Sequence, residues 1–97
     1  MRGVTQTDLM AAARVLLLAP PPSRYAVARA MIAQANAADT YRQKNRCLHP
    51  YFGNGTLLSV ALPRPNAAPN RPGDPEYLSC MALMIDVILE SYSQPTR

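Results

Sequence analysis

The sequence has no tryptophan, one phenylalanine and one histidine, and its only cysteines are Cys47 and Cys80. Two cysteines exclude a disulfide-rich secreted scaffold, which a short chain builds from four or more. We expect no secretory leader, because the apolar run in the first residues is too short and is interrupted by charge. We therefore expect a cytoplasmic protein with reduced thiols, with a single disulfide as the alternative.

Long apolar runs are also missing. In the most apolar segment the unbroken run extends only from Cys80 to Ile85 and stops at Asp86, whereas a membrane span needs about 20 apolar residues. We expect no contact with a membrane. With 97 residues, 48% of them apolar, the chain is long and apolar enough for one modest core. The prediction is a single domain over residues 1–97.

Acidic residues are scarce in the first half of the chain. Residues 1–46 contain seven basic and two acidic residues, and residues 47–97 contain three basic and four acidic ones. A basic half favours nucleic acid, an anionic membrane or an acidic protein as partner. Three of the cations, Arg42, Lys44 and Arg46, also lie where a helix C-terminus favours positive charge. Nucleic-acid binding by the basic N-terminal half is therefore the second functional hypothesis.

The most informative segment that is present runs from Asp74 to Ser93. In helical projection its polar residues form one narrow stripe, and apolar residues fill the remaining arc of roughly 200°. Asp74 suits the N-cap, and Pro75 suits the first helical position. We predict a helix over residues 75–93 at the centre of the core, contacted on two or three sides.

Two further main helices are predicted before this one. The first covers residues 7–19, where Thr5 or Thr7 would form a capping box and three prolines end the helix. The second covers residues 24–44 and would be capped by Ser23.

A short helix over residues 57–62 and a proline-rich loop over residues 63–73 connect these helices to the last one. The predicted fold is therefore all-α, a bundle of three main helices and one short helix with the C-terminal helix at its centre.

Two of these helices have more apolar surface than a core face requires. Val15 and Leu18 lie opposite the main apolar face of the first helix, and alanines repeat behind the core face of the second. We predict an interaction surface for a protein partner or a second copy, with a two-fold homodimer as the simplest arrangement. Alternatively, the bundle hides Val15 and Leu18, and alanine is only a good helix former. The predicted surface consists of Val15, Leu18, Ala26, Ala30, Ala33 and Ala37.

The segment between the second helix and the short helix is the candidate functional loop. Its glycines allow positive φ, and its two aromatic residues would anchor a turn in the core. Cys47 and His49 form a candidate catalytic pair, which makes a small enzyme the third hypothesis, although no third group or oxyanion hole is evident. The loop residues of interest are Cys47, His49, Tyr51, Phe52, Gly53, Asn54 and Gly55.

No metal, cofactor or catalytic residue is predicted with these candidates. A structural zinc site usually needs four cysteine or histidine ligands, and the chain has three such residues. The glycines lack the following Lys-Ser/Thr of a phosphate-binding loop. The leading hypothesis is a non-enzymatic protein-interaction or regulatory helical module.

The order of these segments resembles that of a known group of proteins. The run from His49 to Leu57, HPYFGNGTL, is followed by a Pro/Arg loop and by DPEY at the start of an apolar helix. This arrangement resembles small alphaproteobacterial proteins with a domain of unknown function. The resemblance implies a bacterial cytoplasmic protein and carries over no catalytic or binding residue.

Overall fold

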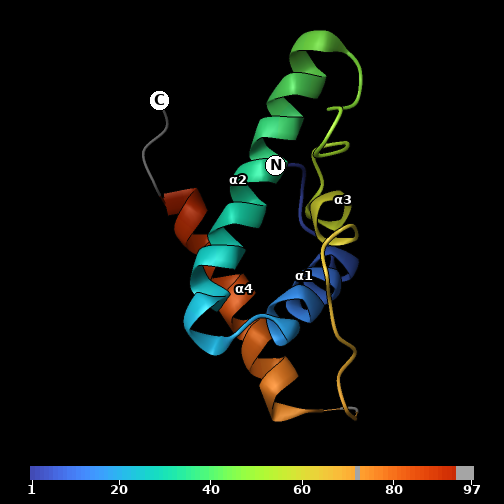
Figure 1. Cartoon of the computed structure of the whole chain (residues 1–97). Coiled ribbons are helices and arrows are strands. Elements are labelled where there is room, and N and C mark those ends of the chain that lie inside the picture. The colour runs from blue at the N-terminus through green and yellow to red at the C-terminus, as the bar shows by residue number, and fades with distance from the viewer. Residues whose placement is uncertain (72, 94–97) are drawn as a thin grey trace.

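The computed structural model describes residues 1–71 and 73–93, and this part of the chain is helical, with no strand (Figure 1). The helices are α1 (Gln6–Leu18), α2 (Arg24–Asn45), α3 (Leu57–Ala61) and α4 (Pro75–Ser93), with a 3₁₀ turn, η1 (Pro21–Ser23), before α2. This arrangement confirms the predicted all-α bundle of three main helices and one short helix. No helix in the described ranges has the length and apolarity to cross a bilayer.

Helix α1 lies across the bundle and packs against α2, α3 and α4 (Figure 1). Because it is covered on several sides, both of its apolar faces are used within the chain. The largest fully buried side chains come from all four helices. They are Leu16, Met31, Leu57, Met84 and Cys80.

Helix α4 is only partly covered by the rest of the bundle. It packs against α1 and α2 through a buried face of Cys80, Met84, Val87 and Ile88. These two helices are the lower of the predicted two or three contacts, and the rest of the apolar arc of α4 faces outward. A bundle of this size has no further helix to place over that side. The large exposed residues on it are Leu78, Ile85, Leu89 and Tyr92.

The side chain of Asp8 joins the starts of two helices. Its Oδ2 atom accepts hydrogen bonds from the backbone N–H (2.7 Å) and the hydroxyl (2.8 Å) of Thr5, which completes the predicted capping box of α1 with Thr5 as the N-cap. Its Oδ1 atom accepts from the backbone N–H of Leu58, at 2.8 Å, in the first turn of α3. Asp8 is only 3% exposed, so this one carboxylate satisfies donors from segments 50 residues apart.

Arg24 performs the corresponding role at the end of α1. Its Nε atom donates to the carbonyl oxygens of Leu16 (2.7 Å) and Ala19 (3.1 Å), and Nη2 donates to that of Leu17 (3.2 Å). A helix C-terminus leaves such carbonyls without partners in the helix. The same guanidinium pairs with Glu76 of α4 at 2.9 Å. Arg24, the first residue of α2, therefore links this helix to the end of α1 and to the start of α4.

The three remaining N-caps are Ser23, Thr56 and Asp74. The Oγ1 atom of Thr56 accepts from the backbone N–H of Ser59 at 3.2 Å at the start of α3. The Oδ1 atom of Asp74 accepts from the backbone N–H of Glu76 at 3.0 Å, as expected for the N-cap of α4. Ser23, by contrast, makes no capping hydrogen bond with its side chain. The prediction for Ser23 is wrong because η1 turns the chain directly into α2 and leaves no extended N-cap residue.

Replacing Asp8 with alanine should lower the free energy of unfolding by about 2 to 4 kcal/mol, because N–H groups at the starts of α1 and α3 lose their acceptor. Urea denaturation followed by circular dichroism measures this. Asp86→Ala is the control and should change stability by less than about 0.5 kcal/mol, since Asp86 is exposed. Equal stability of the two variants would contradict the double-cap interpretation.

The two isoleucines of α4 should respond differently to truncation. Ile88 is 6% exposed and Ile85 is 42% exposed. Ile88→Ala should therefore cost about 2 to 5 kcal/mol of stability, because it leaves a cavity, and Ile85→Ala should cost less than about 1 kcal/mol. The same urea titration compares them, and a loss of similar size in both variants would show that the outer side of α4 is covered in solution.

Candidate functional site

The chain reverses direction after α2 in a turn built around His49. Arg46, at φ 56°, ends α2 in the left-handed region, and its N–H donates to the carbonyl of Arg42 at 2.8 Å. The Nδ1 atom of His49 then accepts from the backbone N–H groups of Tyr51 (3.0 Å) and Phe52 (3.1 Å). The imidazole also stacks on the Phe52 ring, with centroids 4.6 Å apart. His49 is thus held at the inside of the turn.

Two glycines let this turn approach the helices closely. Gly53 has φ 83° and Gly55 has φ 90°, both in the region that favours glycine. A Cβ atom at Gly55 would lie 2.8 Å from the Cα atom of Asp39, and one at Gly53 would lie 2.7 Å from the Cβ atom of Ser59. Both positions therefore combine a backbone requirement with a lack of space. The Oδ1 atom of Asn54 accepts from the N–H of Thr56 at 3.1 Å.

The two cysteines lie in different environments. Cys47 is exposed after α2, and Cys80 is a buried free thiol in α4. Burial raises the pKa of the Cys80 thiol, which disfavours the reactive thiolate. Across residues 1–71 and 73–93, no three histidine, cysteine or acidic side chains are grouped so that they could hold a metal ion.

Asp39 connects α2 to the N-terminal segment. Its carboxylate accepts from Arg42 (2.9 Å) and from Gln43 (3.3 Å), and it lies 3.5 Å from the amino group of Met1. The hydrogen bond from Arg42 holds the pKa of the Asp39 carboxyl below its ordinary value of 3.8. Partial burial raises this pKa, and the positive amino group of Met1 lowers it. The Met1 amino group also donates to Asn36 at 2.5 Å.

The predicted interaction surface is only partly at the surface. Val15 is 4% exposed, because α1 is covered both by α4 and by α3, so including Val15 was wrong. Leu18 is exposed. The four alanines of α2 are also exposed, and one of them, Ala33, lines a groove between α2 and α4. That Ala26, Ala30, Ala33 and Ala37 bind a partner remains a prediction.

The sequence analysis missed an exposed apolar feature, the outer stripe of α4. It consists of Leu78, Ala82, Ile85, Leu89 and Tyr92. The residues follow one another at intervals of four, three, four and three, so they form one line along the helix. The signal was the apolar arc of roughly 200°, which is wider than the face that one helix of a small bundle buries.

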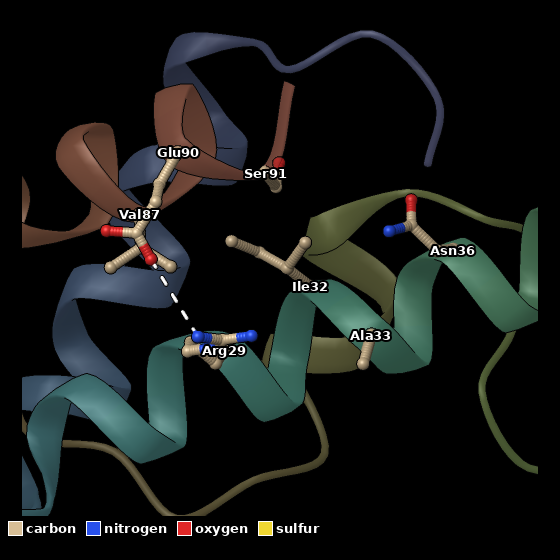
Figure 2. A pocket seen from close by; sticks show the side chains of 7 residues that line it. All are labelled: Arg29, Ile32, Ala33, Asn36, Val87, Glu90 and Ser91. Carbon is tan, nitrogen blue, oxygen red and sulfur yellow. Dashed lines mark ion pairs between the residues drawn. The ribbon is translucent and has the colours of Figure 1, made fainter. Parts of the chain in front are cut away.

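Figure 2 shows a groove between α2 and α4. Its volume is about 140 Å³, smaller than the roughly 300 to 1,000 Å³ of ordinary ligand pockets. Arg29 of α2 faces Glu90 of α4 at 3.8 Å across the groove, and Glu90 also accepts a hydrogen bond from the hydroxyl of Tyr25. Ile32 and Val87 lie among the lining residues. This polar cluster joins two helices, and we interpret the groove as a structural contact.

Comparison with known proteins identifies the family. Residues 2–88 match the profile of "Domain of unknown function (DUF7742)". The chain belongs to this family. No curated protein and no solved structure matches the chain. The DUF7742 match covers α1, α2, α3 and most of α4, including Leu78 and Ile85 of the outer stripe. The family description names no activity.

Asp39 should make stability depend on pH. Because its pKa is lowered in the folded state, the ionised carboxylate stabilises the fold above its unfolded pKa of about 4, and this contribution is lost as the pH falls through the folded value. Asp39→Asn should therefore be less stable than the original protein by about 1 kcal/mol at neutral pH. The difference should shrink as the pH falls below about 4.

Chemical denaturation at a series of pH values measures this difference. Asp86→Asn is the matched control, since Asp86 is exposed and makes no ion pair within the described residues. A stability difference for Asp39→Asn that stays constant at all pH values would show that the effect is not due to the charge.

Proposed function

We propose that this protein is a non-enzymatic interaction module that holds a basic amphipathic helix of a partner protein against the outer stripe of α4. The observation that carries the proposal is the exposure of this stripe: Leu78, Leu89 and Tyr92 are each more than half exposed. Single exposed apolar residues are common on protein surfaces, whereas a continuous group is typical of an interaction site.

The spacing of the stripe supports a helix as its occupant. Alternating intervals of four and three residues are the spacing of the a and d positions in a coiled-coil seam. Five such positions extend from Leu78 to Tyr92, which is two heptads of helix. Ala82 is the only small residue among the larger ones. A partner helix with apolar residues at the same spacing could pack along this line.

Charge supports a basic occupant. The charged residues of α4 are Glu76, Asp86 and Glu90, and residues 75–93 contain no lysine or arginine. Glu76 pairs with Arg24 and Glu90 lies near Arg29, so Asp86 beside the stripe is left for a partner. Packing α4 against α4 of a second copy would bring like charges together, which is unfavourable. Positive residues beside the partner's apolar seam would be attracted instead.

The enzymatic hypothesis receives no comparable support. Because Nδ1 of His49 accepts two backbone hydrogen bonds, the neutral ring carries its proton on Nε2. An imidazole in that state has no free nitrogen to take a proton from the Cys47 thiol. We therefore assign His49 a structural role in the turn.

Two designed helical peptides test the proposal. Both have leucine at the a and d positions, and the flanking e and g positions are lysine in one peptide and glutamate in the other. NMR titration of the isotope-labelled protein should show that the lysine peptide binds and shifts the signals of α4. The glutamate peptide should bind at least about tenfold more weakly, because its charge is repelled by Asp86.

A double variant, Ile85→Ser with Leu89→Ser, should weaken binding of the lysine peptide by at least about tenfold without unfolding the protein, since both side chains are exposed. Leu48→Ser with Leu62→Ser, at two exposed leucines outside α4, is the matched control and should leave binding unchanged. Equal binding of the two peptides would overturn the charge argument, and binding that is insensitive to the α4 variant would overturn the proposal. A sedimentation mass of twice 10.6 kDa for the protein alone would identify a second copy as the occupant.

A further inference from the structure

The end of α2 and the turn after it belong to a stretch of the chain whose charged residues are all basic. Between Thr40 and Gly73 the chain has five basic residues and no acidic residue. The end of α2 and the turn after it, which belong to this stretch, extend beyond the rest of the bundle (Figure 1). The five basic residues are Arg42, Lys44, Arg46, Arg64 and Arg71.

Two shallow depressions lie near each other beside α2 and the turn that follows it. One is lined by residues of α2 and the turn, among them Tyr41, Lys44 and His49. The other lies beside Tyr51 and Arg64. The rings of His49 and Tyr51 have centroids 6.0 Å apart, which joins the two depressions. No acidic side chain lines either depression. We call this surface the basic track, formed by Tyr41, Lys44, His49, Tyr51 and Arg64.

Tyr51 gives the basic track an aromatic platform. The side chain of Tyr51 is 83% exposed, more than any other large apolar or aromatic side chain in the described residues. Its neighbour Phe52 is partly buried against the core and stacks on His49. The sequence predicted that both aromatic residues would anchor the turn in the core, and for Tyr51 this is wrong because its ring lies outside the turn that His49 and Phe52 fill.

The helix dipole explains only part of this arrangement. Cations are favoured near a helix C-terminus, which accounts for Arg42 and Lys44 in the last turn of α2. It does not account for Arg64, which lies after α3 and donates to Gln34 at 3.1 Å. Nor does it explain why the exposed ring of Tyr51 lines one depression together with Arg64 and lies 6.0 Å from the ring of His49 in the other. A ligand that combines negative charge with flat rings would use all of these groups.

We propose that the basic track binds single-stranded nucleic acid. Lys44 and Arg64 attract phosphate groups, and an unstacked base packs on the exposed ring of Tyr51. Proteins that bind single strands without sequence preference combine a positive groove with aromatic side chains in this way. A duplex keeps its bases stacked inside the helix, where Tyr51 cannot reach their faces. This binding does not depend on the outer stripe of α4.

Fluorescence anisotropy with labelled oligonucleotides of about 12 nucleotides tests the inference. The same pyrimidine-rich sequence is used as single-stranded DNA, as single-stranded RNA and as duplex DNA. Both single strands should bind more tightly than the duplex, because only they expose base faces. Affinity should fall as salt rises from about 50 to 200 mM, since phosphate contacts release counterions. A difference between the DNA and RNA strands would show which of them is preferred.

Variants at exposed positions separate stacking from general attraction. Tyr51→Ala should weaken binding of single strands by roughly 5- to 100-fold, and Tyr92→Ala on α4 is the aromatic control that should not. Lys44→Gln should reduce the slope of log affinity against log salt by about 0.7. Arg14→Gln on α1 changes the net charge equally and should leave the slope unchanged.

Three results would overturn the inference. The first is no binding of any oligonucleotide at low salt. The second is duplex binding as strong as single-strand binding, and the third is an equal effect of Tyr51→Ala and Tyr92→Ala. Because Tyr51 and Lys44 lie outside the outer stripe of α4, the peptide titration on that stripe can succeed or fail independently of nucleic-acid binding.

Discussion

The bundle depends on a single buried carboxylate. Asp8 accepts hydrogen bonds from Thr5 at the start of α1 and from Leu58 at the start of α3, and water has almost no access to it. A buried charge is tolerated only when hydrogen bonds replace its hydration. Once Asp8 is placed, the start of α3 is fixed against α1, and the turn after α2 must be short enough to reach it. The positive φ angles of Gly53 and Gly55 meet this requirement.

Arg24 places the same kind of constraint on the other end of α1. It binds the last carbonyl groups of that helix and also Glu76 at the start of α4. Asp8 and Arg24 therefore hold α1 at both ends, with α3 at one end and α2 and α4 at the other. Because α1 contacts every other helix, fixing its ends fixes most of the bundle. Small side chains such as Ala12, Ala13 and Ala28 are fully buried and allow these close approaches.

The two proposed surfaces follow from how the remaining residues are distributed. Helix α4 has apolar residues on more sides than α1 and α2 can cover, and its charged residues are acidic. The stretch after Asp39 has only basic charges until Asp74 and presents Tyr51 to solvent. One surface therefore suits a basic helix and the other suits a polyanion. A protein with both could hold a helical partner and a nucleic-acid strand at the same time, since the surfaces use different elements of the fold.

The sequence by itself determined where helices form and how most of them begin. Thr5 with Asp8, Thr56 and Asp74 are local caps, and three prolines end α1, because these preferences depend on hydrogen bonds and sterics within a few residues. Tertiary structure decided everything that depends on neighbours. Helical periodicity cannot distinguish Ile88, which is buried, from Ile85, which is not, because both lie in the same wide apolar arc. Likewise, only the packing of α1 against the other helices buries Val15, and only the close fit of His49 and Phe52 in the turn leaves Tyr51 outside. The hydrogen bonds between Asp8 and Leu58 and between Arg24 and Leu16 each connect two different helices. A sequence pattern within one helix therefore cannot predict them.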